Sequence, residues 1–153
     1  MQSSGGTWTV YDPPMPIQCA VSHGKRLVVA IAKDKLLASD LVGFLFDLDR
    51  EKAGAYRKIF DLSGVTSLLS DERIETFAEI IRERELSSPA GPLALVAGDP
   101  ILARKAGLFA QKAQGLRPIR VFAEQHDARR WLDSLPGDAV DPGAVAGTPP
   151  DGF

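Results

Sequence analysis

Short apolar runs along the chain predict the strands of a sheet. The runs "IQCAVS" (17–22) and "RLVVAIA" (26–32) are rich in strand-forming residues and are separated only by "HGK". This spacing predicts a β-hairpin with Gly24 in its turn. Three further runs with strand-like composition follow at "YRKIFDL" (56–62), "LALVAG" (93–98) and "IRVFA" (119–123). The run at 93–98 is wholly apolar, which is typical of a central strand covered on both faces.

Between these runs the apolar residues recur at helical spacing, three or four positions apart. The apolar faces are, in chain order, Leu41, Phe44, Leu45 and Leu48; Ile74, Phe77, Ala78 and Ile81; Leu102, Ala106, Phe109 and Ala113; and Ala128, Trp131, Leu132 and Leu135. Ser39, Ser70 and Asp99 stand where the first three helices begin, and each can accept a backbone N–H as an N-cap. The last face directs Trp131 towards the sheet.

The elements therefore follow the order β-β-α-β-α-β-α-β-α. Strands that alternate with helices of this length imply crossovers between parallel strands, while the first hairpin adds an antiparallel edge. We expect an α/β fold, with a mixed sheet of about five strands flanked by about four helices.

Length and composition place these elements in one domain. The chain has 153 residues. We expect a flexible leader at residues 1–15, the folded domain at 16–135 and a disordered tail at 136–153, because the tail is rich in Pro and Gly and poor in large apolar residues. No apolar run approaches the ~20 residues that span a bilayer, so no integral membrane segment is expected.

Charge and chemistry exclude several functions. The net charge of −2 offers no basic footprint for nucleic acid. His23 and His126 belong to no metal-binding or catalytic motif, and the run Arg82–Glu85 has the composition of a solvated helix face. The single cysteine, Cys19, fits a small buried residue of a reducing cytoplasm. We expect a cytoplasmic protein that is not an enzyme and holds no metal or cofactor.

The apolar residues of the first helix leave alternatives open. Phe44, Leu45 and Phe46 supply more hydrophobic surface than one stripe of a helix requires. They could border a pocket or form the contact of a homodimer. They could also be ordinary core residues with one exposed aromatic side chain, since isolated exposed apolar residues are common.

The order of elements, "FDLSGVTSLLSDE" (60–72) and the closing "IRVFAEQHDARRWL" (119–132) together resemble the STAS superfamily of SpoIIAA-like, anti-sigma-factor antagonist-like domains. The resemblance extends from Ile17 to Leu135 and is strongest to bacterial members related to lipid-binding CRAL-TRIO domains. It implies a SpoIIAA-like fold and a regulatory module that interacts with a protein partner. The CRAL-TRIO relationship implies the alternative, a carrier or sensor of a small lipophilic ligand bound between sheet and helices.

Ser70 is the residue on which this resemblance bears most directly. Family antagonists carry Asp-Ser-Ser-Gly at the start of the second helix, and a partner kinase phosphorylates the first serine. Aligning "DLSGVT" (61–66) places Ser70 at that position, although Leu69, Asp71 and Glu72 replace the family's neighbours. A phosphate beside Asp71 and Glu72 would be repelled, whereas the same acids favour a plain helix start. Ser70 is thus either a phosphorylation site, as the resemblance implies, or a helix cap.

Overall fold

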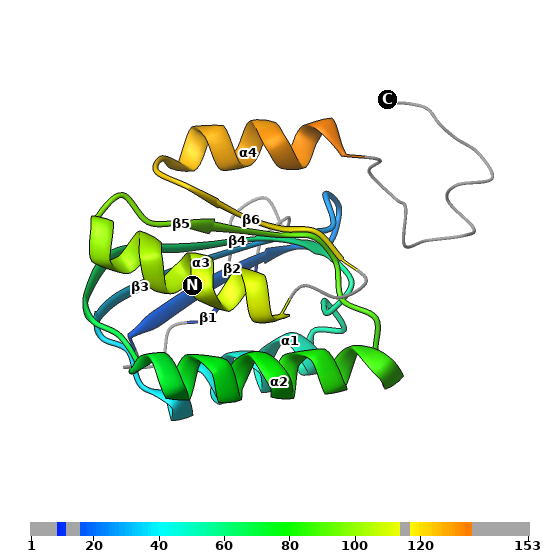
Figure 1. The fold of residues 1–153 in the computed structure, drawn as a ribbon. Coiled ribbons are helices and arrows are strands. Elements are labelled where there is room, and N and C mark those ends of the chain that lie inside the picture. The colour runs from blue at the N-terminus through cyan, green and yellow to red at the C-terminus, as the bar shows by residue number, and fades with distance from the viewer. Residues whose placement is uncertain (1–8, 12–15, 114–116, 136–153) are drawn as a thin grey trace.

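A computed structural model describes residues 9–11, 16–113 and 117–135 of the chain. The rest of the expected leader and the whole expected tail lie outside the described residues. The described chain contains one six-stranded sheet whose strands lie side by side in their order along the sequence (Figure 1). The strands are β1 (Thr9–Tyr11), β2 (Ile17–Ser22), β3 (Leu27–Lys35), β4 (Arg57–Ser67), β5 (Leu93–Val96) and β6 (Ile119–Phe122).

The sheet is mixed, as the sequence predicts. β1, β2 and β3 pair antiparallel, and β3, β4, β5 and β6 pair parallel. The predicted hairpin is confirmed, with Ser22 paired to Leu27 across its turn. The sixth strand, β1, falls within the segment expected to be a flexible leader. Its sequence, Thr-Val-Tyr, consists of strand formers, and it adds to the free edge of β2 with Thr9 opposite Val21.

Four helices cover the two faces of the sheet unequally (Figure 1). α1 (Ala38–Arg50), α2 (Asp71–Ser87) and α3 (Pro100–Ala113) connect successive parallel strands and contribute to one apolar cluster. Crossovers of one hand between successive neighbours leave their helices on the same face. α4 (Gln125–Ser134) follows the last strand and packs on the opposite face. None of the helices in the described residues has the length and apolar character needed to cross a membrane.

The central strands are buried on both faces because their residues alternate between the two clusters. In β4, Phe60 and Leu62 contact the cluster formed with α1, α2 and α3, whereas Ile59 belongs to the cluster formed with α4. In β5, Leu95 and Val96 divide in the same way. This explains the wholly apolar run in the sequence and confirms its prediction as a central strand.

Two of the three predicted helix caps are confirmed. Ser70 Oγ accepts the backbone N–H of Arg73 at 3.3 Å at the start of α2. Asp99 Oδ1 accepts the backbone N–H groups of Ile101 at 2.8 Å and Leu102 at 3.1 Å at the start of α3. Both side chains satisfy donors that would otherwise lack an intrahelical partner.

The predicted cap of α1 is wrong. The helix begins at Ala38, so Ser39 lies inside its first turn. Asp40 reaches back instead, and its Oδ2 accepts the backbone N–H of Leu37 at 2.9 Å. The carboxylate therefore stabilises the helix start as the acidic partner of a capping box does, together with the favourable field of the helix dipole.

Candidate ligand-binding pocket

An apolar cavity lies between the sheet and the three helices on its first face. Its volume is about 130 Å³. A single water molecule needs roughly 10–15 Å³, so the cavity is much larger than a packing void. Most of its lining is hydrocarbon, contributed by Leu36, Leu41, Phe44, Leu45, Leu48, Phe60, Leu62, Leu68, Ile74, Phe77, Ile81, Leu95 and Phe109.

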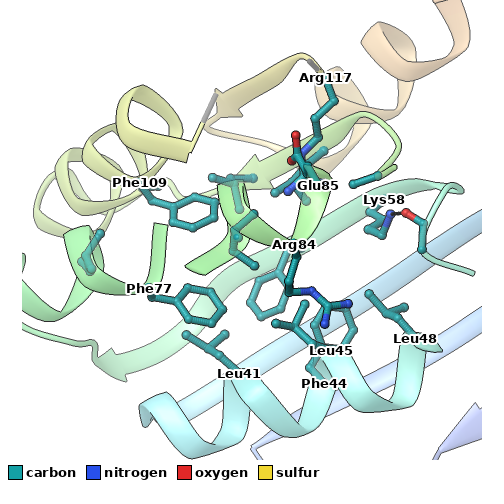
Figure 2. Close-up of a pocket in the computed structure, with 18 of the residues that line it drawn as sticks. Leu41, Phe44, Leu45, Leu48, Lys58, Phe77, Arg84, Glu85, Phe109 and Arg117 are labelled. Atoms are coloured by element: carbon teal, nitrogen blue, oxygen red, sulfur yellow. Dashed lines mark hydrogen bonds and ion pairs between the residues drawn. The ribbon is translucent and has the colours of Figure 1, made fainter. Parts of the chain in front are cut away.

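One end of the cavity is built from aromatic side chains. The rings of Phe77 on α2 and Phe109 on α3 stack with their centroids 5.9 Å apart. Phe44 on α1 and Phe60 on β4 pack edge to face, with their ring centroids 5.3 Å apart. Figure 2 shows Phe77 and Phe109 on the left, above Leu41 of α1. Each of the three helices therefore supplies part of an apolar wall.

The other end of the cavity carries three buried charged side chains. Lys58, Glu85 and Arg117 are only 5%, 7% and 8% exposed. They converge from the start of β4, the last turn of α2 and the segment before β6, and Figure 2 shows them on the side away from Phe77. Charged residues are seldom buried this completely unless they are paired, so this polar end needs an explanation.

The polar end is held by backbone carbonyl groups. Lys58 Nζ donates to the carbonyl oxygens of Gly54 and Tyr56, the second at 2.8 Å. Arg117 Nη1 donates to the carbonyl of Gly91 at 3.1 Å. Arg117 Nε and Glu85 Oε2 lie 2.9 Å apart as an ion pair. The angle of that contact is not that of a hydrogen bond, which leaves both atoms without a hydrogen-bond partner among the described residues.

Gly91 allows the two loops at this end to touch. Its N–H donates to the carbonyl of Gly54 at 3.1 Å. A Cβ at this position would lie 2.3 Å from the carbonyl oxygen of Ala55 and 2.4 Å from that of Tyr56. No larger residue fits without moving the backbone. The glycine therefore fixes the distance between the loops whose carbonyls bind Lys58 and Arg117.

Burial lowers the pKa of both cations of the polar end, Lys58 and Arg117. Loss of solvent and, to a smaller extent, the positive charge of Arg117 together lower the pKa of Lys58 from 10.5 to about 7, against the opposing effect of Glu85. Burial also lowers the pKa of Arg117, and Glu85 again acts in the opposite direction. With Lys58 protonated, the three buried groups carry one net positive charge.

At the carboxyl end of the parallel strands the pocket wall is tied together by a second set of charges. Lys105 Nζ on α3 donates to the carbonyl of Leu69 at 2.8 Å and contacts Asp71 at 3.3 Å. Arg104 bonds both carboxylate oxygens of Asp71 at 3.2 Å. Hydrogen bonds from Arg104, then from Lys105, lower the pKa of Asp71. The start of α2, next to Ser70, is thereby attached to α3.

The structure separates the three residues of α1 that the sequence singled out. Phe44 and Leu45 line the pocket. Phe46 is not among the lining residues and is 58% exposed. The pocket interpretation therefore fits two of the three residues, and the third belongs to the outer surface. Ser70 caps α2, and its phosphorylation stays a prediction.

The buried charges were not found from the sequence, and one expectation was wrong. Glu85 was expected on a solvated helix face, but it continues the buried stripe of Ala78 and Ile81 by one further turn. Lys58 was not singled out, although it lies two positions before Phe60 and therefore on the same inward face of β4. The helical spacing of Glu85 and the strand alternation of Lys58 could therefore have indicated that both side chains are buried. Arg117 follows no such period, and only the fold brings it to Glu85.

The remaining titratable candidates lie outside the pocket. Burial, with smaller contributions from Asp47 and Glu51, raises the pKa of the Cys19 thiol to about 12, so it stays protonated and unreactive. His23, in the turn of the first hairpin, bridges Tyr56 Oη at 2.7 Å and Glu51 Oε1 at 2.8 Å.

A possible cation-binding group occurs at the start of α4. Glu124, His126 and Asp127 bring potential ligand atoms within 4.8 Å of one another on the surface of the described chain. None of the three lines the pocket. The expected absence of a metal stays a prediction.

Comparison with known proteins gives a limited result. No protein-family model matches the chain. No curated protein is significantly similar to it in sequence. A solved structure of an uncharacterised protein of the DUF3478 family from Shewanella loihica PV-4, described as having a SpoIIAA-like fold, is 12% identical, with a TM-score of 0.49. The match covers 86% of this chain and 99% of that chain.

A SpoIIAA-like fold is also what the sequence resemblance predicts. The α/β class itself follows from the mixed sheet and the two helical layers of this chain.

Proposed function

We propose that the protein is a non-enzymatic cytoplasmic carrier or sensor of a small lipophilic ligand. The ligand binds between the sheet and helices α1, α2 and α3. The observation that supports this most is the cavity of about 130 Å³, lined by hydrocarbon from all three helices and by buried charged side chains at one end. An apolar cleft with a few convergent polar groups is the usual form of a small-molecule site.

Decan-1-ol tests this proposal because it is lipophilic and carries no charge. Burying roughly eight of its methylenes at about 0.8 kcal/mol each gives about 6 kcal/mol, or a Kd of tens of micromolar. Isothermal titration calorimetry should show saturable binding. Ala106→Leu should abolish it, because Ala106 is buried in the wall and a leucine would fill the cavity. Gln111→Leu, at an exposed position of the same helix, is the matched control.

The result is decisive in both directions. Binding that is lost in Ala106→Leu and kept in Gln111→Leu, with both variants folded by circular dichroism, supports the pocket. Absence of binding to the unmodified protein, or equal binding by both variants, contradicts it.

A regulatory protein-interaction module is the second candidate. Val42 and Phe46 lie one turn apart on α1 and are 38% and 58% exposed, which gives this helix an apolar outer side. Because α1 also forms a pocket wall, a ligand that shifts the helix would change this outer side. Sedimentation velocity of Phe46→Ser tests for a homodimer: the unmodified protein should self-associate and the variant should not. A monomer in both cases would argue against self-association through this helix.

A further inference from the structure

The buried charges at one end of the pocket suggest which ligand it takes. We infer that the ligand is a lipophilic carboxylic acid whose carboxylate binds against Lys58 and Arg117, with its hydrocarbon chain directed towards Phe77 and Phe109. The inference rests on the proposed function, because it names the chemical class of ligand for the same pocket.

The first argument is that hydrogen-bond donors remain at the polar end. A lysine ammonium has three N–H donors, and the structure gives Lys58 two carbonyl acceptors. Arg117 Nε is buried 2.9 Å from Glu85 Oε2, in an ion pair that lacks the geometry of a hydrogen bond. Among the described residues, donors of two cations at one end of the cavity thus lack a hydrogen-bonded acceptor. A carboxylate supplies two oxygens that accept such donors.

The second argument is the balance of charge. Lys58 and Arg117 face one carboxylate, Glu85, so one positive charge is uncompensated when Lys58 is protonated. An unpaired buried charge is costly, and the lowered pKa of Lys58 reflects that cost. A monoanion neutralises the cluster. A phosphate monoester, with about two negative charges, would leave an excess, and an amine would add a third cation.

The third argument is the distribution of polarity along the cavity. The three buried charged side chains, Lys58, Glu85 and Arg117, gather on one side, and the stacked rings of Phe77 and Phe109 form the opposite wall (Figure 2). Two further cations line the pocket and both have partners: Arg84 pairs with Asp49 at 3.0 Å, and Lys105 donates to the carbonyl of Leu69 and contacts Asp71. A molecule with one charged end and an unbranched apolar chain matches this arrangement.

A matched series of ligands tests the inference. Decanoic acid, decan-1-ol and decylamine share one chain length and differ only in the polar end. At pH 7 decanoate should bind at least about tenfold more tightly than the alcohol, the lower range for a hydrogen bond to a charged group. Decylamine should bind more weakly than the alcohol, because it adds a positive charge. Calorimetry below the aggregation concentration of each compound measures all three.

Substitution of Lys58 separates the polar end from the cavity. Lys58→Met should remove the preference for decanoate and leave the affinity for decan-1-ol within about threefold, because the apolar lining is unchanged. Lys112→Met, at an exposed position of α3, is the matched control and should keep the preference.

The pH dependence of the unmodified protein gives a second readout that does not depend on a variant. The charged groups facing Lys58 are Arg117, which precedes β6, and Glu85 of α2, with Arg84 of the same helix also lining the pocket. Decanoate requires a protonated Lys58, so its affinity should fall about tenfold between pH 7 and pH 8.5. The affinity for decan-1-ol should not fall.

These measurements distinguish failure of the inferred carboxylate site from failure of the proposed lipophilic pocket. If decan-1-ol binds as tightly as decanoate and neither affinity depends on pH, the inferred carboxylate site is wrong and the proposed lipophilic pocket stands. If none of the three compounds binds, the proposed function falls and the inference falls with it. If decylamine binds best, the charge argument is refuted.

Discussion

Lys58 should make the ligand-free protein more stable at mildly alkaline pH. Its pKa is about 7 in the folded protein, compared with 10.5 for an ordinary lysine. Between these values the unfolded chain binds a proton that the folded protein does not, so the free energy of unfolding rises with pH. The stabilisation is complete above the unfolded pKa and is lost as the pH falls through about 7.

The size of the effect follows from these two values. Each pH unit between them corresponds to about 1.4 kcal/mol, so the whole interval represents roughly 5 kcal/mol. From pH 7 to pH 8.5 the gain should be about 1.5 kcal/mol, because at pH 7 the folded protein is half protonated. Cys19 acts in the opposite direction, since its pKa is raised from 9.0 to about 12, but only as the pH passes 9.0.

Urea denaturation at pH 7.0, 7.5, 8.0 and 8.5 measures this gain. With a slope of about 1–3 kcal/mol per molar urea, the midpoint should move up by roughly 0.5–1.5 M. Lys58→Met should flatten the profile whatever its own stability, and Lys112→Met should retain it. A flat or falling profile in the unmodified protein, or an unchanged rise in Lys58→Met, would refute the assignment to Lys58.

Three further predictions concern the parts that hold the pocket together. Gly91→Ala should cost more than about 2 kcal/mol on urea denaturation, because its Cβ would lie 2.3 Å from a backbone oxygen. Gly107→Ala, with nothing within 4 Å of its Cβ, should stabilise α3 by about 0.5–1 kcal/mol, and the opposite order would contradict this account. Glu85→Leu alone should lower the free energy of unfolding by about 3–5 kcal/mol, because it leaves Arg117 buried without its partner. The double variant with Arg117→Leu should lose much less, and equal losses would mean that the two residues are not energetically coupled. Ser70→Ala should lower the free energy of unfolding by about 1 kcal/mol and Ser70→Asp should change it little. Phosphate found on Ser70 by mass spectrometry of protein isolated from its source cells would show that the residue does more than cap α2.

The fold was predictable because, along most of the chain, the local sequence patterns indicate the same strands and helices that the structure contains. Alternation in the strands, helical spacing and the caps at Ser70 and Asp99 all indicate the same elements. Two details were not predictable in this way. β1 is a three-residue strand preceded and followed by polar or proline-rich sequence, and it depends on pairing with β2. Trp131, expected to face the sheet, is half-buried against Phe122 and Arg120, because its face of the sheet is covered by α4 alone.

The pocket was only partly predictable. Phe44 and Leu45 drew attention because the first helix has surplus apolar surface, and both line the cavity. The charged end depends on contacts between residues distant in sequence: Glu85 meets Arg117, and Lys58 meets the loop before it. Sequence composition treats a charged residue as exposed, and only tertiary packing reveals which ones are buried.

The strand order of the sheet also has a consequence for biosynthesis. Because every strand pairs with the strand before it, the chain can add each new element to a neighbour that has already left the ribosome. No strand has to wait for a distant partner. Arg117 is the last pocket-lining residue along the described chain, so its ion pair with Glu85 cannot form until nearly the whole domain has been made. Closure of the charged end is thus a late step, and a nascent chain paused before residue 117 would have the sheet of β2 to β5 but an open pocket.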